Sequence, residues 1–120
     1  MKILLVDDDA FLRDMYATKF QEAGHEVMVA FNGEEGLEKI EKEDFDVVLM
    51  DMVMPNMTGI EMINKVQKGP KANKVNCIVL SNQGEERDKS AAKEAGAIGY
   101  IVKAESIPSE VVAKVENLVK

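Results

Sequence analysis

Short apolar stretches rich in β-branched residues alternate along the whole chain with segments whose apolar residues recur every three or four positions. The first pattern is typical of strands that are covered on both faces, and the second is typical of amphipathic helices. Five strands are predicted, at residues 2–6, 26–30, 45–50, 75–80 and 97–102. Because strands that alternate with helices form right-handed βαβ units, the pattern predicts an α/β fold around one parallel sheet.

Helix boundaries in the sequence agree with this phasing. Asn32 and Thr58 each precede a glutamate by three residues, which is the spacing of a capping box at a helix N-terminus. Pro108 is placed in the first turn of the last predicted helix, where its missing N–H costs little. Glycines stand where helices are expected to end, at Gly24, Gly69 (followed by Pro70) and Gly96.

Length and composition narrow the class of protein. With 120 residues, 46% of them apolar, the chain is expected to form a single domain over residues 1–120. The net charge of −7 disfavours direct binding to nucleic acid or to anionic membranes. No apolar run reaches 18 residues and no signal peptide is evident, so we expect no membrane span. The single cysteine, Cys77, cannot form an internal disulfide, and a cytoplasmic location is expected.

Polar residues follow four of the predicted strands at their carboxyl ends: Asp7-Asp8-Asp9, Asp51, Ser81-Asn82 and Lys103. In an open parallel sheet, ligands bind outside the carboxyl ends of the strands. With the flavodoxin-like strand order 2-1-3-4-5, the tips of strands one, three, four and five are consecutive neighbours about 4.8 Å apart. The sequence therefore predicts one site that contains these side chains.

The chemistry of this predicted site points to phosphoryl transfer. Crowded carboxylates repel one another, and a hard divalent cation such as Mg²⁺, which prefers oxygen ligands, offsets that repulsion. Lys103 and Ser81 add a positive charge and a hydroxyl that suit an anion in contact with the metal. A carboxylate nucleophile forms an aspartyl-phosphate, and Asp51 stands alone at the centre of the predicted site.

Structural roles for the same aspartates are the alternative interpretation. Asp7, Asp8 and Asp9 favour a helix N-terminus, and Asp9 is assigned to capping. Asp51 precedes the turn-like sequence Met54-Pro55-Asn56. However, Asp51 also follows an apolar run expected to be buried, where an unpaired carboxylate is costly, and this favours a functional role.

Four separated motifs, in this order, together resemble the response-regulator receiver domain of two-component signalling: Val6-Asp7-Asp8, Asp51 with Met54-Pro55-Asn56-Met57-Thr58-Gly59, Ser81, and Gly99-Tyr100-Ile101-Val102-Lys103. The resemblance covers essentially the whole chain. It implies a (βα)5 doubly wound fold and a signalling switch rather than an enzyme. In such a switch, Asp51 accepts a phosphoryl group from the phosphohistidine of a sensor histidine kinase or histidine phosphotransfer protein.

The resemblance also implies a role for each matched residue. Asp8, Asp51 and the backbone carbonyl of Val53 would bind Mg²⁺, and Asp7 would bind it through a water. Ser81 and Lys103 would bind the phosphoryl group, and Tyr100 would rotate inward as Ser81 moves. The fourth helix, fifth strand and fifth helix would then bind a downstream protein partner or an output domain. The expected state is a monomer or a weak phosphorylation-dependent dimer.

Three departures from the family pattern are visible in the sequence. Asn82 replaces a small residue after Ser81, and its bulk is expected to slow the entry of small phosphodonors or of water. Ala104 replaces a proline that usually forms a cis bond, so we expect a trans bond with a shifted loop, or strain. Val53 and Gln83 occupy the positions that tune phosphoryl lifetime in the family, so the sequence does not fix that lifetime.

Two other functions share this topology. A metal-dependent phosphatase would carry its nucleophile in a D-x-D loop after the first strand and would need an inserted cap, for which 120 residues leave no room. A flavin carrier would need a Ser/Thr/Gly-rich first loop, whereas Asp7-Asp8-Asp9 would repel a phosphate.

Outside the site, we expect Cys77 to be buried and His25 to be structural or exposed. We also expect four methionines to divide between core and surface: Met50, Met52, Met54 and Met57.

Overall fold

Five strands and five α-helices alternate along residues 1–120, all of which the computed structural model describes. The strands are β1 Lys2–Val6, β2 Glu26–Ala30, β3 Val47–Met50, β4 Asn76–Ser81 and β5 Gly99–Val102. The helices are α1 Ala10–Glu22, α2 Gly33–Lys42, α3 Gly59–Lys68, α4 Glu86–Ala95 and α5 Pro108–Val119, with a 3₁₀ turn at Lys103–Glu105.

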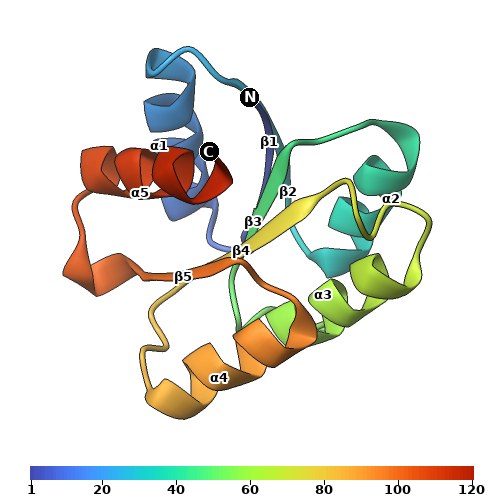
Figure 1. Ribbon diagram of the computed structural model, residues 1–120. Coiled ribbons are helices and arrows are strands. Elements are labelled where there is room, and N and C mark those ends of the chain that lie inside the picture. Colours follow the sequence, from blue (N-terminus) through green and yellow to red (C-terminus); the bar gives the residue numbers. More distant parts are fainter.

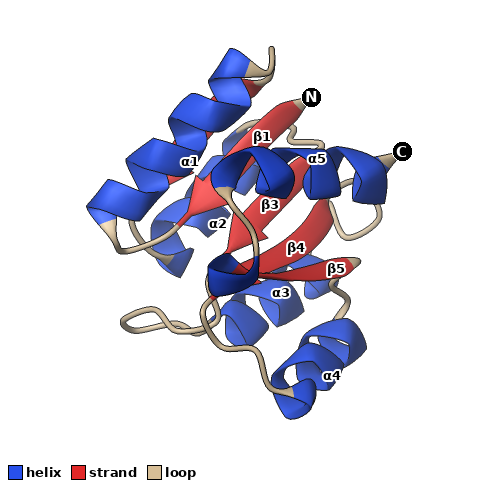
Figure 2. Cartoon of the chain, turned by 90° about the vertical axis from the view of Figure 1, so that its left-hand side faces the viewer, coloured by secondary structure: helices blue, strands red, loops and turns tan.

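The sheet is fully parallel and has the strand order β2-β1-β3-β4-β5, as predicted. Helices α1 and α5 cover one face, and α2, α3 and α4 cover the other (Figure 1). The same division appears from the side, with the strands running between the two helix layers (Figure 2). This doubly wound (βα)5 arrangement confirms the predicted fold class.

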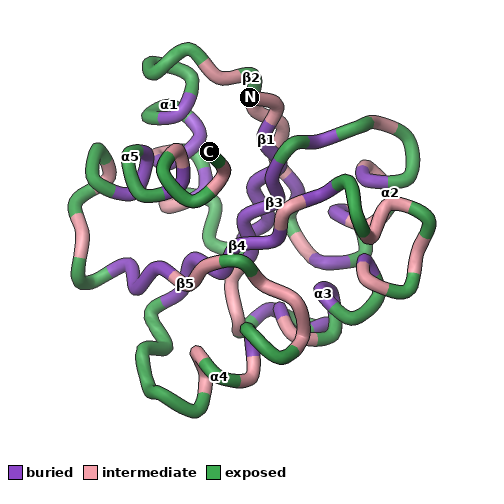
Figure 3. The backbone as a smooth tube through the Cα atoms, in the orientation of Figure 1, coloured by how far each residue is buried: buried purple, intermediate pink, exposed green.

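Alternate residues of the strands face the two helix layers. In β1, Ile3 and Leu5 belong to the cluster under α1 and α5, whereas Leu4 and Val6 belong to the cluster under the other three helices. All four are at most 1% exposed. The buried residues are therefore concentrated in the central strands β1, β3 and β4 (Figure 3). This explains why the sequences of these strands are almost continuously apolar.

The helix boundaries follow the predicted signals. The side chain of Asn32 accepts a hydrogen bond from the Glu35 backbone, and Thr58 and Glu61 form a complete capping box. Asp9 caps α1 through the Leu12 backbone N–H, as expected. The three glycines predicted to end helices do so, and Pro108 is the first residue of α5.

Three strand boundaries differ from the prediction. β3 begins at Val47, because Asp46 lies in a bend and its carboxylate accepts a hydrogen bond from the Lys2 backbone N–H, although Phe45 is buried in the core. β5 begins at Gly99 because the N–H of Ala97 still bonds to the last turn of α4. β4 is displaced by one residue, so that Ser81 belongs to the strand.

Helices α3 and α4 differ in how much of their surface is buried in the core. α3 buries Met62, Ile63 and Val66, whereas α4 buries only Ala92 and has no side-chain cap at its N-terminus. None of the helices is long and apolar enough to cross a membrane.

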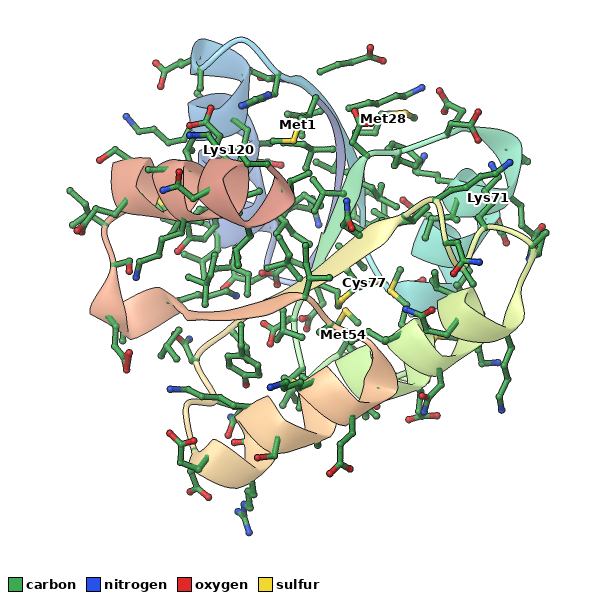
Figure 4. All side chains as sticks on the ribbon, viewed as in Figure 1. Met1, Met28, Met54, Lys71, Cys77 and Lys120 are labelled. Atoms are coloured by element: carbon green, nitrogen blue, oxygen red, sulfur yellow. The ribbon has the colours of Figure 1, made fainter.

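The expected division of the methionines is wrong. Met50, Met54 and Met57 are buried and Met52 is half-buried, because the loop after β3 folds back over the core instead of projecting outward. Cys77 is buried, as expected, and it belongs to the same cluster as Met54; both residues are labelled in Figure 4. His25 has a structural role, since its ring nitrogens contact the Met1 amino group and the Glu116 carboxylate.

Candidate functional site

The strand register aligns the polar residues at the carboxyl edge of the sheet. Val6 of β1 pairs with Met50 of β3, so the residues that follow them, Asp7 and Asp51, emerge side by side. On the next two strands Ser81 pairs with Val102, which Lys103 follows directly. The parallel topology therefore brings four of the predicted residues to one place.

Two hydrogen-bond donors hold the Asp51 carboxylate, one neutral and one positively charged. The Ser81 hydroxyl donates a hydrogen bond of 2.7 Å to Asp51 Oδ1, and the Lys103 ammonium donates one of 3.0 Å to Oδ2. The Asp51 side chain is 15% exposed, so its carboxylate is reachable from solvent while both oxygens are fixed. This arrangement orients a carboxylate at the rim of the sheet.

Lys103 joins Asp51 to Asp7. Its Nζ lies 2.7 Å from Asp7 Oδ2, and the Lys103 and Asp7 side chains are only 6% and 3% exposed. Burial lowers the pKa of Lys103, but the hydrogen bonds and charges of Asp7 and Asp51 outweigh it, so the pKa lies above its ordinary value. The lysine is therefore a permanent cation between two carboxylates.

Ser81 connects the site to the loop before α4. Its Oγ accepts a hydrogen bond of 3.2 Å from the Gln83 N–H, and the Tyr100 hydroxyl donates to the Gln83 carbonyl oxygen. Burial, followed by the nearby charge of Asp88, raises the pKa of Tyr100 to about 12, so its hydroxyl stays protonated and available as a donor. Contacts thus run without interruption from Asp51 through Ser81 and Gln83 to Tyr100.

A close approach of backbone to backbone sets the position of Asp51. The Gly59 N–H bonds to the Met52 carbonyl, and a Cβ on Gly59 would collide with the Asp51 carbonyl oxygen. The turn between them also needs Asn56 at a φ of 68°, a left-handed conformation that asparagine tolerates better than most residues. The sequence from Asp51 to Gly59 therefore folds back as one tight loop.

The remaining predicted ligands are more exposed. Asp8 and Val53 are both exposed, and the Val53 N–H lies 3.3 Å from Asp51 Oδ1. No three or more His, Cys, Asp and Glu side chains are grouped so that they could bind a metal ion. A Mg²⁺ site needs fewer carboxylates, because this ion keeps several waters and is bound by one or two carboxylates. The donor set of Asp8, Asp51 and a carbonyl, with Asp7 nearby, fits that chemistry.

The peptide between Lys103 and Ala104 is trans, and no cis peptide bond occurs in the chain. Of the two outcomes expected for the missing proline, the structure has the trans bond. Residues Lys103–Glu105 form a 3₁₀ turn directly after β5. The lysine is the first residue of that turn and still reaches both carboxylates.

Sequence reasoning did not single out Arg13, which lies next to the site. Its guanidinium Nη1 donates a hydrogen bond of 3.1 Å to the Asp7 carbonyl oxygen, and the residue is 6% exposed. Its spacing carried a signal, because Arg13 precedes Tyr16, Ala17 and Phe20 by three, four and seven positions, on the buried stripe of α1. A charged residue on an apolar stripe indicates a specific partner.

A doubly wound parallel sheet with carboxylates, a lysine and a serine joined at its carboxyl edge defines a flavodoxin-like α/β domain with an acidic, lysine-paired site. Residues 3–116 match the family described as the response regulator receiver domain. The chain belongs to this family, a class of signalling module in two-component systems.

Solved structures and curated relatives agree with this assignment. The chemotaxis protein CheY4 of Vibrio cholerae superposes with a TM-score of 0.91 at 32% identity, over 98% of this chain and 97% of that chain. The receiver domain of the Francisella response regulator 1452 gives a TM-score of 0.88 at 30% identity, with 98% and 95% covered.

Two curated relatives are longer than this chain. The transcriptional regulatory protein ResD of Bacillus subtilis is 35% identical over 119 residues, which are 99% of this chain and 48% of ResD. The phosphate regulon transcriptional regulatory protein PhoB of Pseudomonas aeruginosa is 33% identical over 118 residues, which are 98% of this chain and 51% of PhoB. The chain thus spans about half the length of these two relatives.

Proposed function

We propose that this chain is a phosphoacceptor switch in which Asp51 receives a phosphoryl group from the phosphohistidine of a sensor histidine kinase or a histidine phosphotransfer protein. The observation that carries the proposal is the double contact of the Asp51 carboxylate with Ser81 Oγ and Lys103 Nζ. A hydroxyl and an ammonium on either side of a reachable carboxylate form a binding site for the oxygens of a phosphoryl group.

In the transfer step, one Asp51 oxygen forms a bond to phosphorus while the phosphorus–nitrogen bond of the phosphohistidine breaks. The electron pair of that bond leaves with the imidazole, and Asp51 becomes an acyl phosphate. Catalysis of such a step consists mainly of positioning and of stabilising charge on the equatorial oxygens. Lys103 supplies a fixed positive charge and Ser81 a donor, both already beside the carboxylate.

Mg²⁺ would be bound by Asp8, Asp51 and the Val53 carbonyl, with Asp7 acting through a water. When bound, it would supply the positive charge that offsets repulsion between the carboxylates and the incoming phosphoryl group. Lys103 keeps Asp7 and Asp51 close to each other, which limits how far these two groups must move.

Switching would follow the contacts that lead away from Asp51. A phosphoryl oxygen takes the place of Asp51 Oδ1 as the acceptor for Ser81, and Ser81 in turn is bonded to Gln83. Tyr100 contacts the same Gln83, so a shift of Ser81 reaches the face formed by α4, β5 and α5. Phosphorylation shifts the balance between the active and inactive conformations of this face. The shift can be no larger than the preference of the phosphoryl group for one conformation over the other.

The same proposal covers partners and location. The relatives ResD and PhoB are transcriptional regulatory proteins about twice as long, which supports an output domain or a downstream protein partner for this chain. The net charge of −7 supports the absence of direct nucleic-acid or membrane contact by the chain itself. We propose a cytoplasmic monomer, or a weak dimer that depends on phosphorylation. Self-catalysed phosphoryl transfer and autodephosphorylation would be its only reactions.

The test is phosphorylation of the purified protein by phosphoramidate with Mg²⁺, followed by intact-mass spectrometry. We expect one alkali-labile, hydroxylamine-sensitive phosphoryl group in the unaltered protein and none in Asp51→Asn. Asp44→Asn is the matched control, because Asp44 is an exposed aspartate that precedes β3 at the opposite end of the sheet. Retained phosphorylation in Asp51→Asn, or its absence in the unaltered protein, would contradict the assignment.

A further inference from the structure

We propose that Arg13 is a positioning residue, which fixes the peptide group between Asp7 and Asp8 and thereby the direction of both carboxylates. The proposal rests on the proposed function, because it concerns the carboxylates assigned there to Mg²⁺. Arg13 is one of two arginines in the chain, and its side chain is 7% exposed, whereas that of Arg87 is 82% exposed.

The contact that carries the proposal is the hydrogen bond of 3.1 Å from Arg13 Nη1 to the carbonyl oxygen of Asp7. That carbonyl belongs to the peptide group whose nitrogen is the Asp8 N–H, so one bond restrains the link between two predicted ligands. On the other side of the same residue, the Asp7 N–H bonds to the Ala30 carbonyl at 3.2 Å. The Asp9 N–H bonds to Asp7 Oδ1 at 2.9 Å. Without Arg13, only the nitrogen and the carboxylate of Asp7 are tied.

The surroundings of the guanidinium argue against a role in packing alone. Its Nε is buried without a hydrogen-bond partner, and the ion pair with Asp14 is long, at 3.6 Å, to a side chain that is 71% exposed. A buried guanidinium is costly without close pairing, and an apolar residue of similar volume is often at least as stable. The free-energy cost of burying this guanidinium is therefore consistent with a functional role for Arg13 beside Asp7 and Asp8.

The Arg13 guanidinium also packs against the ring of Phe31. The Arg13 guanidinium carbon lies 4.4 Å from the centre of the Phe31 ring, a cation–π contact from the residue that follows β2. Arg13 thus connects the ends of β1 and β2 through one planar group. A planar group with a ring against its face has little freedom to move away from the Asp7 carbonyl.

The experiment compares Arg13→Met with Arg13→Lys and measures Mg²⁺ affinity by calorimetry on the folded full chain. We expect Arg13→Met to bind Mg²⁺ about tenfold more weakly, the lower end of the 10–100-fold loss typical for groups that orient metal ligands. Arg13→Lys keeps a donor and the charge and should recover most of the affinity. In metal-free protein, the Asp9 amide hydrogen should exchange faster in Arg13→Met, because its acceptor Asp7 is less restrained.

Two control variants separate positioning from charge and from stability. Arg87→Met removes an equal charge from an exposed position, and Val115→Ala removes buried volume from α5. Both should keep Mg²⁺ affinity within twofold. Equal affinity of Arg13→Met and the unaltered protein, or an equal loss in Val115→Ala, would overturn the proposal. If the unaltered protein binds no Mg²⁺, the proposed function itself fails, and the Asp9 exchange rate alone then decides whether Arg13 restrains the loop.

Discussion

Replacing Lys103 with methionine should destabilise the metal-free protein strongly, because it removes the shared counterion of two carboxylates. Lys103 Nζ lies 2.7 Å from Asp7 and 3.0 Å from Asp51. Removal of one partner from a buried ion pair costs about 3–5 kcal/mol. Asp51 is 15% exposed and recovers some hydration, whereas Asp7 is 3% exposed and does not. We therefore expect a loss of about 3 kcal/mol in the free energy of unfolding.

Urea denaturation followed by far-UV circular dichroism, in buffer with a chelator, measures this loss in a chain without tryptophan. With a slope of about 2 kcal/mol per M, the midpoint should fall by about 1.5 M. A chain of 120 residues has roughly 12 kcal/mol of stability at ~0.1 kcal/mol per residue, so the variant should still fold.

Two further variants make the reasoning refutable. Adding Asp7→Asn to Lys103→Met removes the more buried of the uncompensated charges, and we expect it to restore about 1.5 kcal/mol, about half of the loss. Lys93→Met, at an exposed lysine, should change stability by no more than about 0.5 kcal/mol. A loss below about 1 kcal/mol in Lys103→Met, or a double variant no more stable than the single one, would show that the carboxylates do not depend on this lysine.

Gly59→Ala should slow phosphorylation of Asp51 and lower stability by about 1–3 kcal/mol, because the new methyl group collides with the Asp51 carbonyl oxygen. Gly69→Ala, whose Cβ would meet no atom closer than 3.5 Å, is the control, and equal phosphoramidate kinetics in the two variants would disprove the steric argument. Burial raises the pKa of Cys77 to about 11, so at pH 8 its thiol should react with a disulfide reagent about a hundredfold more slowly in the folded than in the unfolded protein. Labelling at equal rates would show that the thiol is not buried.

The sequence sufficed for the fold because its signals are local and agree with one another. Hydrophobic periodicity and the caps at Asn32 and Thr58 predicted the elements, and the strand order then brought Asp7 and Asp51 to one edge. Strand ends were less predictable, since Phe45 is apolar and buried without belonging to β3. Apolar character alone does not distinguish a strand from a loop residue that packs on the core.

The site was predictable in its residue types and not in its contacts. Periodicity cannot tell that Lys103 bonds to both Asp7 and Asp51, because those distances depend on the path of the 3₁₀ turn after β5. Arg13 escaped notice for a related reason. Its partner is a backbone carbonyl, which leaves no trace in a sequence, and only its place on the buried stripe of α1 could have revealed it.

The weak attachment of α4 has a consequence for how the domain can respond. Only Ala92 of this helix is buried, and no side chain caps its start, so local opening of α4 costs far less than opening the sheet. Its amide hydrogens should therefore exchange ahead of those in the central strands. Helix α4 begins five residues after Ser81. A small displacement of the Ser81 hydroxyl can therefore move this one weakly packed helix while the sheet and the other helices keep their positions.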